Sequence, residues 1–244
     1  WKLVGQVSFG LVLGTLLLFF PVIPPDTIPA SATTLPFFKF VIVVFAPWVY
    51  VTFVTFVITG SSNAVNLTDG LDGLATGLSA IAAGGFALFA YLLGRVDATG
   101  YLNLFYLPGA GELTIFCAAL LGGCLGFLWF NAHPAQVFMG DTGSLALGGA
   151  FGTVSILLKS EFLLLVIGGV FVAEAVSVIL QTGVYRWYKR SRGKEYADQH
   201  RVFRMAPLHH HFEKLGWHES TVVTRFYILG IFCAMVALAT LKLR

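Results

Sequence analysis

Residues 63–94 read NAVNLTDGLDGLATGLSAIAAGGFALFAYLLG, and they hold both features that decide the fold. From residue 71 onward the stretch is predominantly apolar and long enough for a helix that crosses a bilayer, which needs about 20 such residues. Four polar side chains stand three residues apart before and at the start of this run: Asn63, Asn66, Asp69 and Asp72. The stretch predicts a membrane helix whose entry carries amides and carboxylates.

The whole chain shares this apolar character. Of its 244 residues, 57% are hydrophobic and 11% are charged, whereas a soluble domain has about 25% charged residues. The net charge of +3 is too small to indicate a nucleic-acid partner. The composition predicts an all-α, polytopic membrane helical bundle that forms a single integral membrane domain over residues 1–244.

Apolar runs of spanning length predict about seven transmembrane helices, of which the fifth is short and glycine-rich. The predicted spans are residues 3–23, 37–58, 71–94, 112–130, 143–158, 161–184 and 221–241.

The largest connection predicts the orientation of these spans. Residues 185–220 hold eight of the 15 Lys and Arg residues, and such loops stay in the cytoplasm. By parity, residues 1–2, 59–70 and 131–142 share that side, while the proline-rich hairpin over 24–36 lies opposite. Every stretch with candidate chemistry is therefore predicted to face the cytoplasm.

The polar residues of the opening stretch suit a binding groove. A spacing of three places helical side chains on one slowly drifting face, so the four residues could line one wall, with Gly70 and Gly73 allowing close approach. The alternative is helix capping by Asp69. Capping does not explain two amides and two carboxylates at a membrane edge, where ionisable groups are costly and usually functional.

A second candidate is Asp141, in the sequence FMGDTGS over residues 138–144. A carboxylate in a glycine-lined turn at a helix start suits Mg²⁺, which proteins usually hold with one or two carboxylates plus substrate phosphates. The helix N-terminus also attracts anionic oxygens. The alternative is an N-cap that Ser144 completes.

The sequence PLHHHFE over residues 207–213 carries three consecutive histidines, which point in different directions on any regular element. His209, His210 and His211 therefore do not form one metal site from a helix, and further zinc ligands at suitable separations are missing. With Arg201 and Arg204 nearby, the segment suits an anion, and the alternative is a loop that binds lipid headgroups. Carboxylates for Mg²⁺ and cations for phosphate together predict phosphoryl transfer between a nucleotide-linked phosphate and a lipid phosphate.

Three stretches resemble a known family: NAVNLTDGLDGLATG (63–77), FNAHPAQVFMGDTGSLALGG (130–149) and MAPLHHHFEKLGW (205–217). They are similar to the polyprenyl-phosphate N-acetylhexosamine-1-phosphate transferases, and PLHHHFE points to the bacterial phospho-N-acetylmuramoyl-pentapeptide branch. The resemblance extends over essentially the whole chain. It implies Mg²⁺-dependent transfer from UDP-MurNAc-pentapeptide to undecaprenyl phosphate, which yields lipid I and UMP for peptidoglycan synthesis. It also implies a homodimer among the lipids of the bacterial inner membrane.

The resemblance also implies roles for individual residues. Asp141 would be the Mg²⁺ ligand, Phe138 would stack on the uracil, and Lys2 would lie near the substrate phosphates. The catalytic group would be Asp69, Asp72, Asp141, His209 and His210. The substrate-binding group would be Lys2, Asn63, Asn66, Asn131, Phe138, Ser144, Gln181 and His211.

This sequence departs from the family pattern in two places. The family has about ten spans and an upstream Asp-Asp pair, whereas this sequence has no adjacent Asp pair. We therefore expect that the first three or so transmembrane helices are missing and that this chain alone is inactive. Residues 192–201 also form a longer stretch than is common in that loop.

Three other interpretations remain open. A transferase that uses UDP-GlcNAc belongs to the same superfamily, although PLHHHFE argues against it. A transporter of lipid-linked precursors also uses intramembrane acids, but here the acids gather at one membrane face. A structural scaffold would leave the three-residue spacing unexplained.

Overall fold

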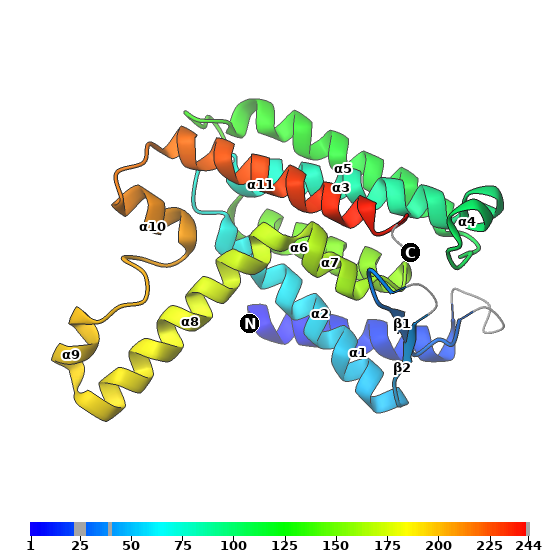
Figure 1. Ribbon diagram of the computed structural model, residues 1–244, viewed down its shortest axis with the longest axis horizontal. Helices are drawn as coiled ribbons and strands as arrows, with labels where there is room; N and C mark the ends of the chain where they lie inside the picture. Colours follow the sequence, from blue (N-terminus) through cyan, green and yellow to red (C-terminus); the bar gives the residue numbers. More distant parts are fainter. Residues whose placement is uncertain (22–27, 39–40, 243–244) are drawn as a thin grey trace.

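The computed structural model describes residues 1–21, 28–38 and 41–242, and within them the chain is a bundle of helices (Figure 1). The prediction of an all-α membrane bundle is confirmed, apart from one short antiparallel pair of strands that pairs Ala32 with Val44. The elements in chain order are α1 (Lys2–Phe19), β1 (Ala32–Thr34), β2 (Ile42–Val44), α2 (Pro47–Thr68), α3 (Leu74–Leu93), α4 (Val96–Leu102), α5 (Ala110–Asn131), α6 (Gly140–Leu157), α7 (Glu161–Ile167), α8 (Gly169–Arg192), α9 (Lys194–Gln199), α10 (Leu208–Lys214) and α11 (Glu219–Ala239).

The described helices include five that are long and apolar enough to cross a membrane, namely α1, α2, α3, α5 and α11. The number becomes six if α7 and α8 are counted as one bent span. The fifth predicted span, over residues 143–158, does form the helix α6, but α6 is not among the helices of spanning character. Its polar first turn and its glycines reduce its hydropathy, so five or six of the described helices have spanning character where the sequence predicts about seven spans.

Two predicted boundaries were wrong. The span predicted over 37–58 begins only at Pro47, which stands at the first position of α2, where its missing N–H and fixed φ favour helix initiation. Residues 59–68, predicted as a loop, continue α2. Residues 96–102, which lie between the spans predicted over 71–94 and 112–130, form α4. Residues 24–27 of the proline-rich hairpin lie outside the described residues.

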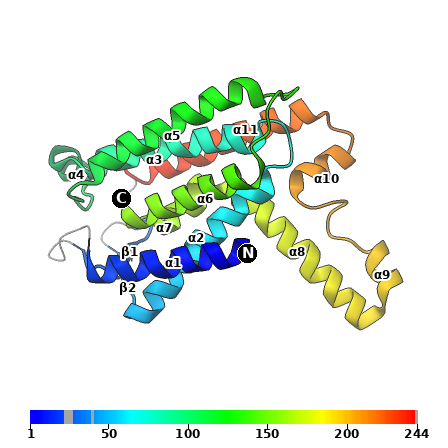
Figure 2. The ribbon, with the colours of Figure 1, turned by 180° about the vertical axis from the view of Figure 1, so that it is seen from behind.

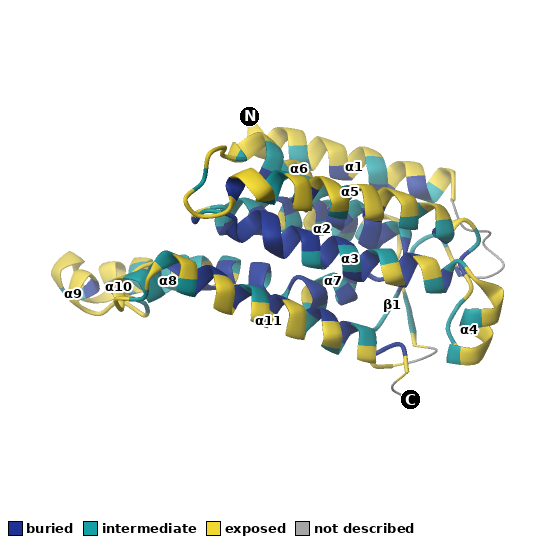
Figure 3. Cartoon of the chain, turned by 90° about the horizontal axis from the view of Figure 1, so that it is seen from above, coloured by how far each residue is buried: buried dark blue, intermediate teal, exposed yellow. Residues whose placement is uncertain are grey.

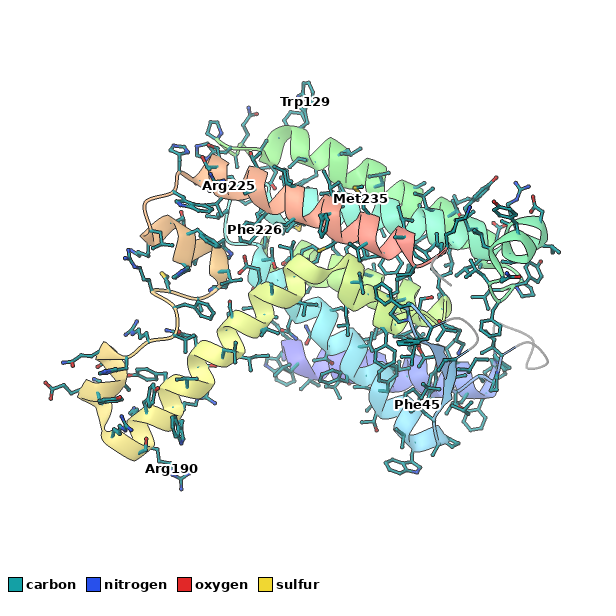
Figure 4. The ribbon with its side chains drawn as sticks, in the orientation of Figure 1. Phe45, Trp129, Arg190, Arg225, Phe226 and Met235 are labelled. Atoms are coloured by element: carbon teal, nitrogen blue, oxygen red, sulfur yellow. The ribbon has the colours of Figure 1, made fainter. Side chains whose placement is uncertain are left out.

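Helix α3 lies at the centre of the bundle, and its surface is mostly buried (Figure 3). Leu74, Leu78 and Phe86 are almost fully buried in the main core. The outer helices are exposed instead. Trp129 on α5 extends away from the bundle (Figure 4), and Trp129 and Met235 on α11 are 82% and 62% exposed. Large apolar side chains on the outside fit a surface covered by lipid.

Small residues bring two helix pairs together. A Cβ added to Gly10 on α1 would lie 2.6 Å from the Thr55 Cα atom of α2. A Cβ added to Gly148 on α6 would lie 2.3 Å from the Ser61 carbonyl oxygen of α2. Close backbone approach through small residues is typical of helix packing in membranes. Helix α2 is therefore held between α1 and α6, and α1 lies beside it in the view from behind (Figure 2).

The span predicted over residues 161–184 is broken. Helices α7 and α8 meet at Gly168 with an angle of 87°. Helix α8 then runs out of the bundle to Arg192 and carries α9 at its far end (Figure 1). Helix α10 returns the chain to the start of α11 (Figure 1). The break places α10 beside the turn between α2 and α3, where the candidate site lies.

Candidate functional site

The four polar residues with three-residue spacing sit around the turn that joins α2 to α3. Asn63 and Asn66 lie near the end of α2, Asp69 is the C-cap residue, and Asp72 precedes α3. The helix ends before the spacing does, so the four side chains reach different partners. Asn63 donates from Nδ2 to the Gln6 Oε1 atom of α1 over 2.8 Å.

The first polar cluster centres on Asp141, in the first turn of α6. Its carboxylate pairs with the Lys2 ammonium and accepts a hydrogen bond from Asn66 Nδ2 over 2.8 Å. Asn66 Nδ2 also lies 2.9 Å from Ser144 Oγ, which is fully buried. Three chain segments that are far apart in sequence thus meet at one carboxylate. We call Lys2, Asn66, Asp141 and Ser144 the Asp141 cluster.

The surroundings of this cluster shift the pKa values of two carboxyl groups in opposite directions. Hydrogen bonds from Lys2 and from Asn66 lower the pKa of Asp141, so its exposed carboxylate is ionised at neutral pH. Burial raises the pKa of Asp69, and the negative charge of Asp141 raises it further. The charge of Asp141 thus opposes ionisation of Asp69, and a nearby cation would favour the ionised form of Asp69.

A second cluster surrounds Asp72. Its Oδ2 atom accepts a hydrogen bond from Ala135 N over 3.0 Å and lies 3.2 Å from His133 Nδ1. The Asp72 amide donates to Glu219 Oε1 over 2.8 Å, and Glu219 Oε2 lies 3.5 Å from His133 Nδ1. Ligand atoms from Asp72, His133 and Glu219 all lie within 4.8 Å of one another, so this group could hold a metal ion. Its contacts tie α3, α11 and the loop after α5 together.

The loop after α5 carries Phe138 and is held by Asn131. Asn131 is 4% exposed, accepts a hydrogen bond from Thr76 Oγ1 over 2.7 Å and donates to the Val137 carbonyl over 2.8 Å. Phe138 itself is 76% exposed. Asn131 therefore positions the loop from within the protein, while the Phe138 ring is free to stack on a flat ligand.

The three histidines of α10 have different surroundings. His209 is fully buried, and its ring lies against Gly70 in the turn between α2 and α3. His210 and His211 are partly exposed. His210 Nδ1 lies 2.6 Å from Glu213 Oε2, and His211 Nδ1 accepts a hydrogen bond from Arg204 N over 3.1 Å. The first histidine is thus part of the interior, and the other two lie nearer the surface.

Gln181 does not join the clusters by any described contact. Its side chain donates to the Phe203 carbonyl over 3.2 Å and accepts from the Phe203 amide over 2.9 Å. This reciprocal pair fixes the segment between α9 and α10 to α8. Gln181 therefore acts on the position of the histidine segment.

Sequence reasoning did not single out several residues that complete these clusters, namely Gln6, His133, Glu174 and Glu219. Glu174 left a visible signal, because it is a lone carboxylate in the apolar run 161–184, and ionisable groups in such runs are usually functional. The other three lie at ends of helices or in a loop, where polar residues are common. Their partners come from distant segments, and local pattern does not show them.

Known proteins resemble this chain along its full length. The model of the family described as Glycosyl transferase family 4 matches residues 1–159. A phospho-N-acetylmuramoyl-pentapeptide-transferase of Gemmatimonas aurantiaca is 64% identical over 248 residues, which cover 100% of this chain and 64% of the relative. Proteins with the same name from Chloroherpeton thalassium and Desulfotalea psychrophila are 50% and 52% identical, again over 100% of this chain. The chain spans 64% and 63% of the lengths of these two relatives.

Proposed function

Since this chain belongs to glycosyl transferase family 4, we propose that the protein that contains it transfers phospho-MurNAc-pentapeptide to a lipid carrier. The donor would be UDP-MurNAc-pentapeptide and the acceptor undecaprenyl phosphate, with lipid I and UMP as products. The observation that carries this proposal is the Asp141 cluster, which combines a cation, an amide and an ionised carboxylate at a helix start. Phosphoryl transfer depends mainly on positioning and on charge stabilisation, and these groups supply both.

The residues present fit Mg²⁺ as the cofactor. Asp141 offers an exposed carboxylate, and Mg²⁺ prefers oxygen ligands and is usually shared between carboxylates and substrate phosphates. Asp141 would hold the ion, with Asp69 as a second acidic group in the cleft. When bound, the ion neutralises charge on the phosphate oxygens during transfer. Lys2, released from its ion pair, would then hold a phosphate oxygen.

The remaining predicted residues have separate roles in this proposal. Asn63, Asn66 and Ser144 would orient the pyrophosphate, and Asp72 would act as an acidic group at the start of α3. Phe138, which Asn131 positions, would stack on the uracil. His210 and His211 would contact the donor at the surface of the cleft.

The lipid acceptor needs an apolar path to the cluster. A cavity of ≈ 280 Å³ lies between α2, α7 and α8, and its lining includes Phe53, Phe56, Phe162 and Phe171. Such a cavity suits part of an isoprenoid chain. Phe56 in this lining is 75% exposed on α2, a helix of spanning character, so entry of a lipid from the bilayer past this side chain fits the proposal. The proposal places the protein in the inner membrane as a homodimer, with its active site facing the cytoplasm.

The test is release of UMP by the full-length protein that contains this sequence. Undecaprenyl phosphate and Mg²⁺ are supplied, and UDP-MurNAc-pentapeptide is compared with UDP-GlcNAc as donor. Release with the muramoyl donor alone, and its loss in Asp141→Asn, is the expected result. Release with UDP-GlcNAc would assign the protein to the sister branch. Flux of an intact lipid-linked precursor across vesicles without UMP release would indicate a transporter. Full activity in Asp141→Asn would refute the metal assignment.

A further inference from the structure

Glu174 is a carboxylate that no part of the proposed reaction uses, although it contacts a residue of the candidate site. It lies on α8, its side chain is 0% exposed, and it faces the start of α10. Burial of an ionisable group without partners is strongly unfavourable. The contacts of Glu174 therefore indicate the role of its side chain.

Three hydrogen bonds reach the two oxygens of Glu174. Leu208 N donates to Oε2 over 2.6 Å, and His209 N donates to Oε1 over 3.2 Å. His209 Nδ1 lies 3.1 Å from the same Oε1 atom. The two amides are among those at the beginning of α10 that lack partners within the helix. Glu174 thus satisfies the start of α10 and holds the His209 ring at the same time.

The contact with Glu174 determines where the imidazole carries its proton. Both oxygens of Glu174 accept hydrogen bonds from backbone N–H groups, so in the contact with the ring Nδ1 is the donor. In the neutral ring the other nitrogen, Nε2, is then an unprotonated acceptor. His209 Nε2 is buried and has no hydrogen-bond partner among the described residues.

The position of Nε2 connects it to the candidate site. A Cβ added to Gly70 would lie 2.4 Å from Nε2 and 3.0 Å from Cε1, so the ring faces the backbone next to Asp69. A buried acceptor without a partner costs free energy, and native proteins rarely leave one unsatisfied. A residue needed only for packing at this place would be apolar. An acceptor kept here indicates a donor that arrives with the substrate.

We propose that Glu174 is a positioning residue that fixes the Nδ1–H form of His209, so that Nε2 accepts a hydrogen bond from the bound nucleotide sugar. The group that binds Nε2 is a hydroxyl or an amide N–H, because phosphate oxygens have no proton to donate. Gly70 is required because only a residue without Cβ leaves space beside Nε2. The kinetic part of this inference rests on the proposed function, whereas the ring form does not.

The first measurement uses the wild-type full-length protein in detergent, labelled with ¹⁵N-histidine, with His209→Gln to assign the resonance. We expect a protonated Nδ1 and an unprotonated Nε2, whose signals are widely separated. A proton on Nε2, with or without one on Nδ1, would overturn the inference. On addition of the muramoyl nucleotide, the Nε2 signal should shift toward the hydrogen-bonded value. Addition of inorganic pyrophosphate should leave it unchanged, and double protonation with pyrophosphate would also overturn the inference.

Glu174→Gln tests the role of the carboxylate. Gln has one acceptor oxygen where Glu has two, so either the Leu208 amide or the His209 ring faces an NH₂ group. We expect a decrease in kcat of about 10–100-fold, the usual effect of losing a group that orients a histidine, with KM changed less than kcat. The proton should move toward Nε2. An unchanged ring form together with unchanged kcat would refute the role of Glu174.

Two further variants separate positioning from folding. Ser177→Ala lies on the same buried face of α8, one turn from Glu174, and removes a hydrogen bond within the helix. It should change neither the ring form nor kcat. Gly70→Ala keeps the Glu174 contact but fills the space at Nε2, so kcat should fall while the Nδ1–H form remains. Wild-type kcat in Gly70→Ala would overturn the inference even if Glu174→Gln does not fold. Absence of transfer in the wild type would refute the proposed function and leave the ring measurement valid.

Discussion

Replacement of Asn131 by Leu tests how the loop that carries Phe138 is held. The Asn131 side chain is almost fully buried and makes two hydrogen bonds, one from Thr76 on α3 and one to the Val137 carbonyl in the loop. Leu has similar volume but no polar atoms. Asn131→Leu therefore removes both bonds, and it leaves the buried Thr76 hydroxyl and the Val137 carbonyl without these partners.

The expected loss of unfolding free energy follows from the two hydrogen bonds of Asn131. A typical hydrogen bond contributes about 1 kcal/mol net, and a buried group left unpaired costs about 1–3 kcal/mol. We expect Asn131→Leu to reduce the free energy of unfolding by about 2–4 kcal/mol. Thr76→Val removes one bond and should cost about 1–2 kcal/mol. Hydrogen bonds between membrane helices average about 0.6 kcal/mol and reach about 1.7. The double variant should therefore be more stable than the sum of the single effects predicts, by an amount in this range.

The assay is thermal unfolding of the purified protein in detergent, at one scan rate for all variants. For a chain of this size, each kcal/mol corresponds to a shift of about 2–4 °C. Thr224→Val is the control, since it removes a hydroxyl whose one hydrogen bond within the described residues goes to the Ser220 carbonyl of its own helix. Its effect should be close to zero. Strict additivity of Thr76→Val and Asn131→Leu would refute the reasoning, because it would mean that the two side chains do not interact.

Three other changes have expected outcomes. Gly148→Ala places a Cβ against the backbone of Ser61 and should destabilise the protein by about 1–3 kcal/mol. Gly122→Ala should not, because a Cβ there has no described atom of a neighbouring segment within 4 Å. Equal unfolding temperatures of the two variants would contradict the close packing of α6 on α2. Gln181→Leu removes both bonds to Phe203 and should speed trypsin cleavage between α9 and α10, measured against cleavage elsewhere in the chain. Chelation of divalent cations should abolish UMP release, and added Mg²⁺ should restore it; release that persists in excess chelator would contradict the metal role.

The sequence predicted the fold class well because lipid imposes long apolar runs. Each of the five described helices of spanning character overlaps a predicted span. The errors occurred where tertiary packing overrides hydropathy. Helix α6 is polar at its start and glycine-rich, and it packs closely on α2. The break at Gly168 lies in an apolar run that predicts a straight span, and only the packing of α7 and α8 shows the change in direction.

The candidate site was also partly predictable from the sequence. Asp141 was predicted at a helix start and lies there, and Lys2 and Asn66 reach it from other segments. The partners of Asp72 could not be predicted, because His133 and Glu219 come from a loop and from the last helix. The roles assigned to the individual residues stay predictions. The sequence shows which residues have side chains able to bind a ligand or take part in catalysis. Only the fold shows which of these residues contact one another.

The bend at Gly168 also determines how far the protein extends from its helical bundle. Helix α8 has 24 residues and, at a rise of 1.5 Å per residue, is about 36 Å long. Set almost at a right angle to α7, it runs out of the bundle, and Arg190 of its basic last turn lies at the far end (Figure 4). A straight continuation of α7 would instead keep this turn in line with the apolar helix. The bend therefore gives the protein a charged arm that projects from the bundle (Figure 1).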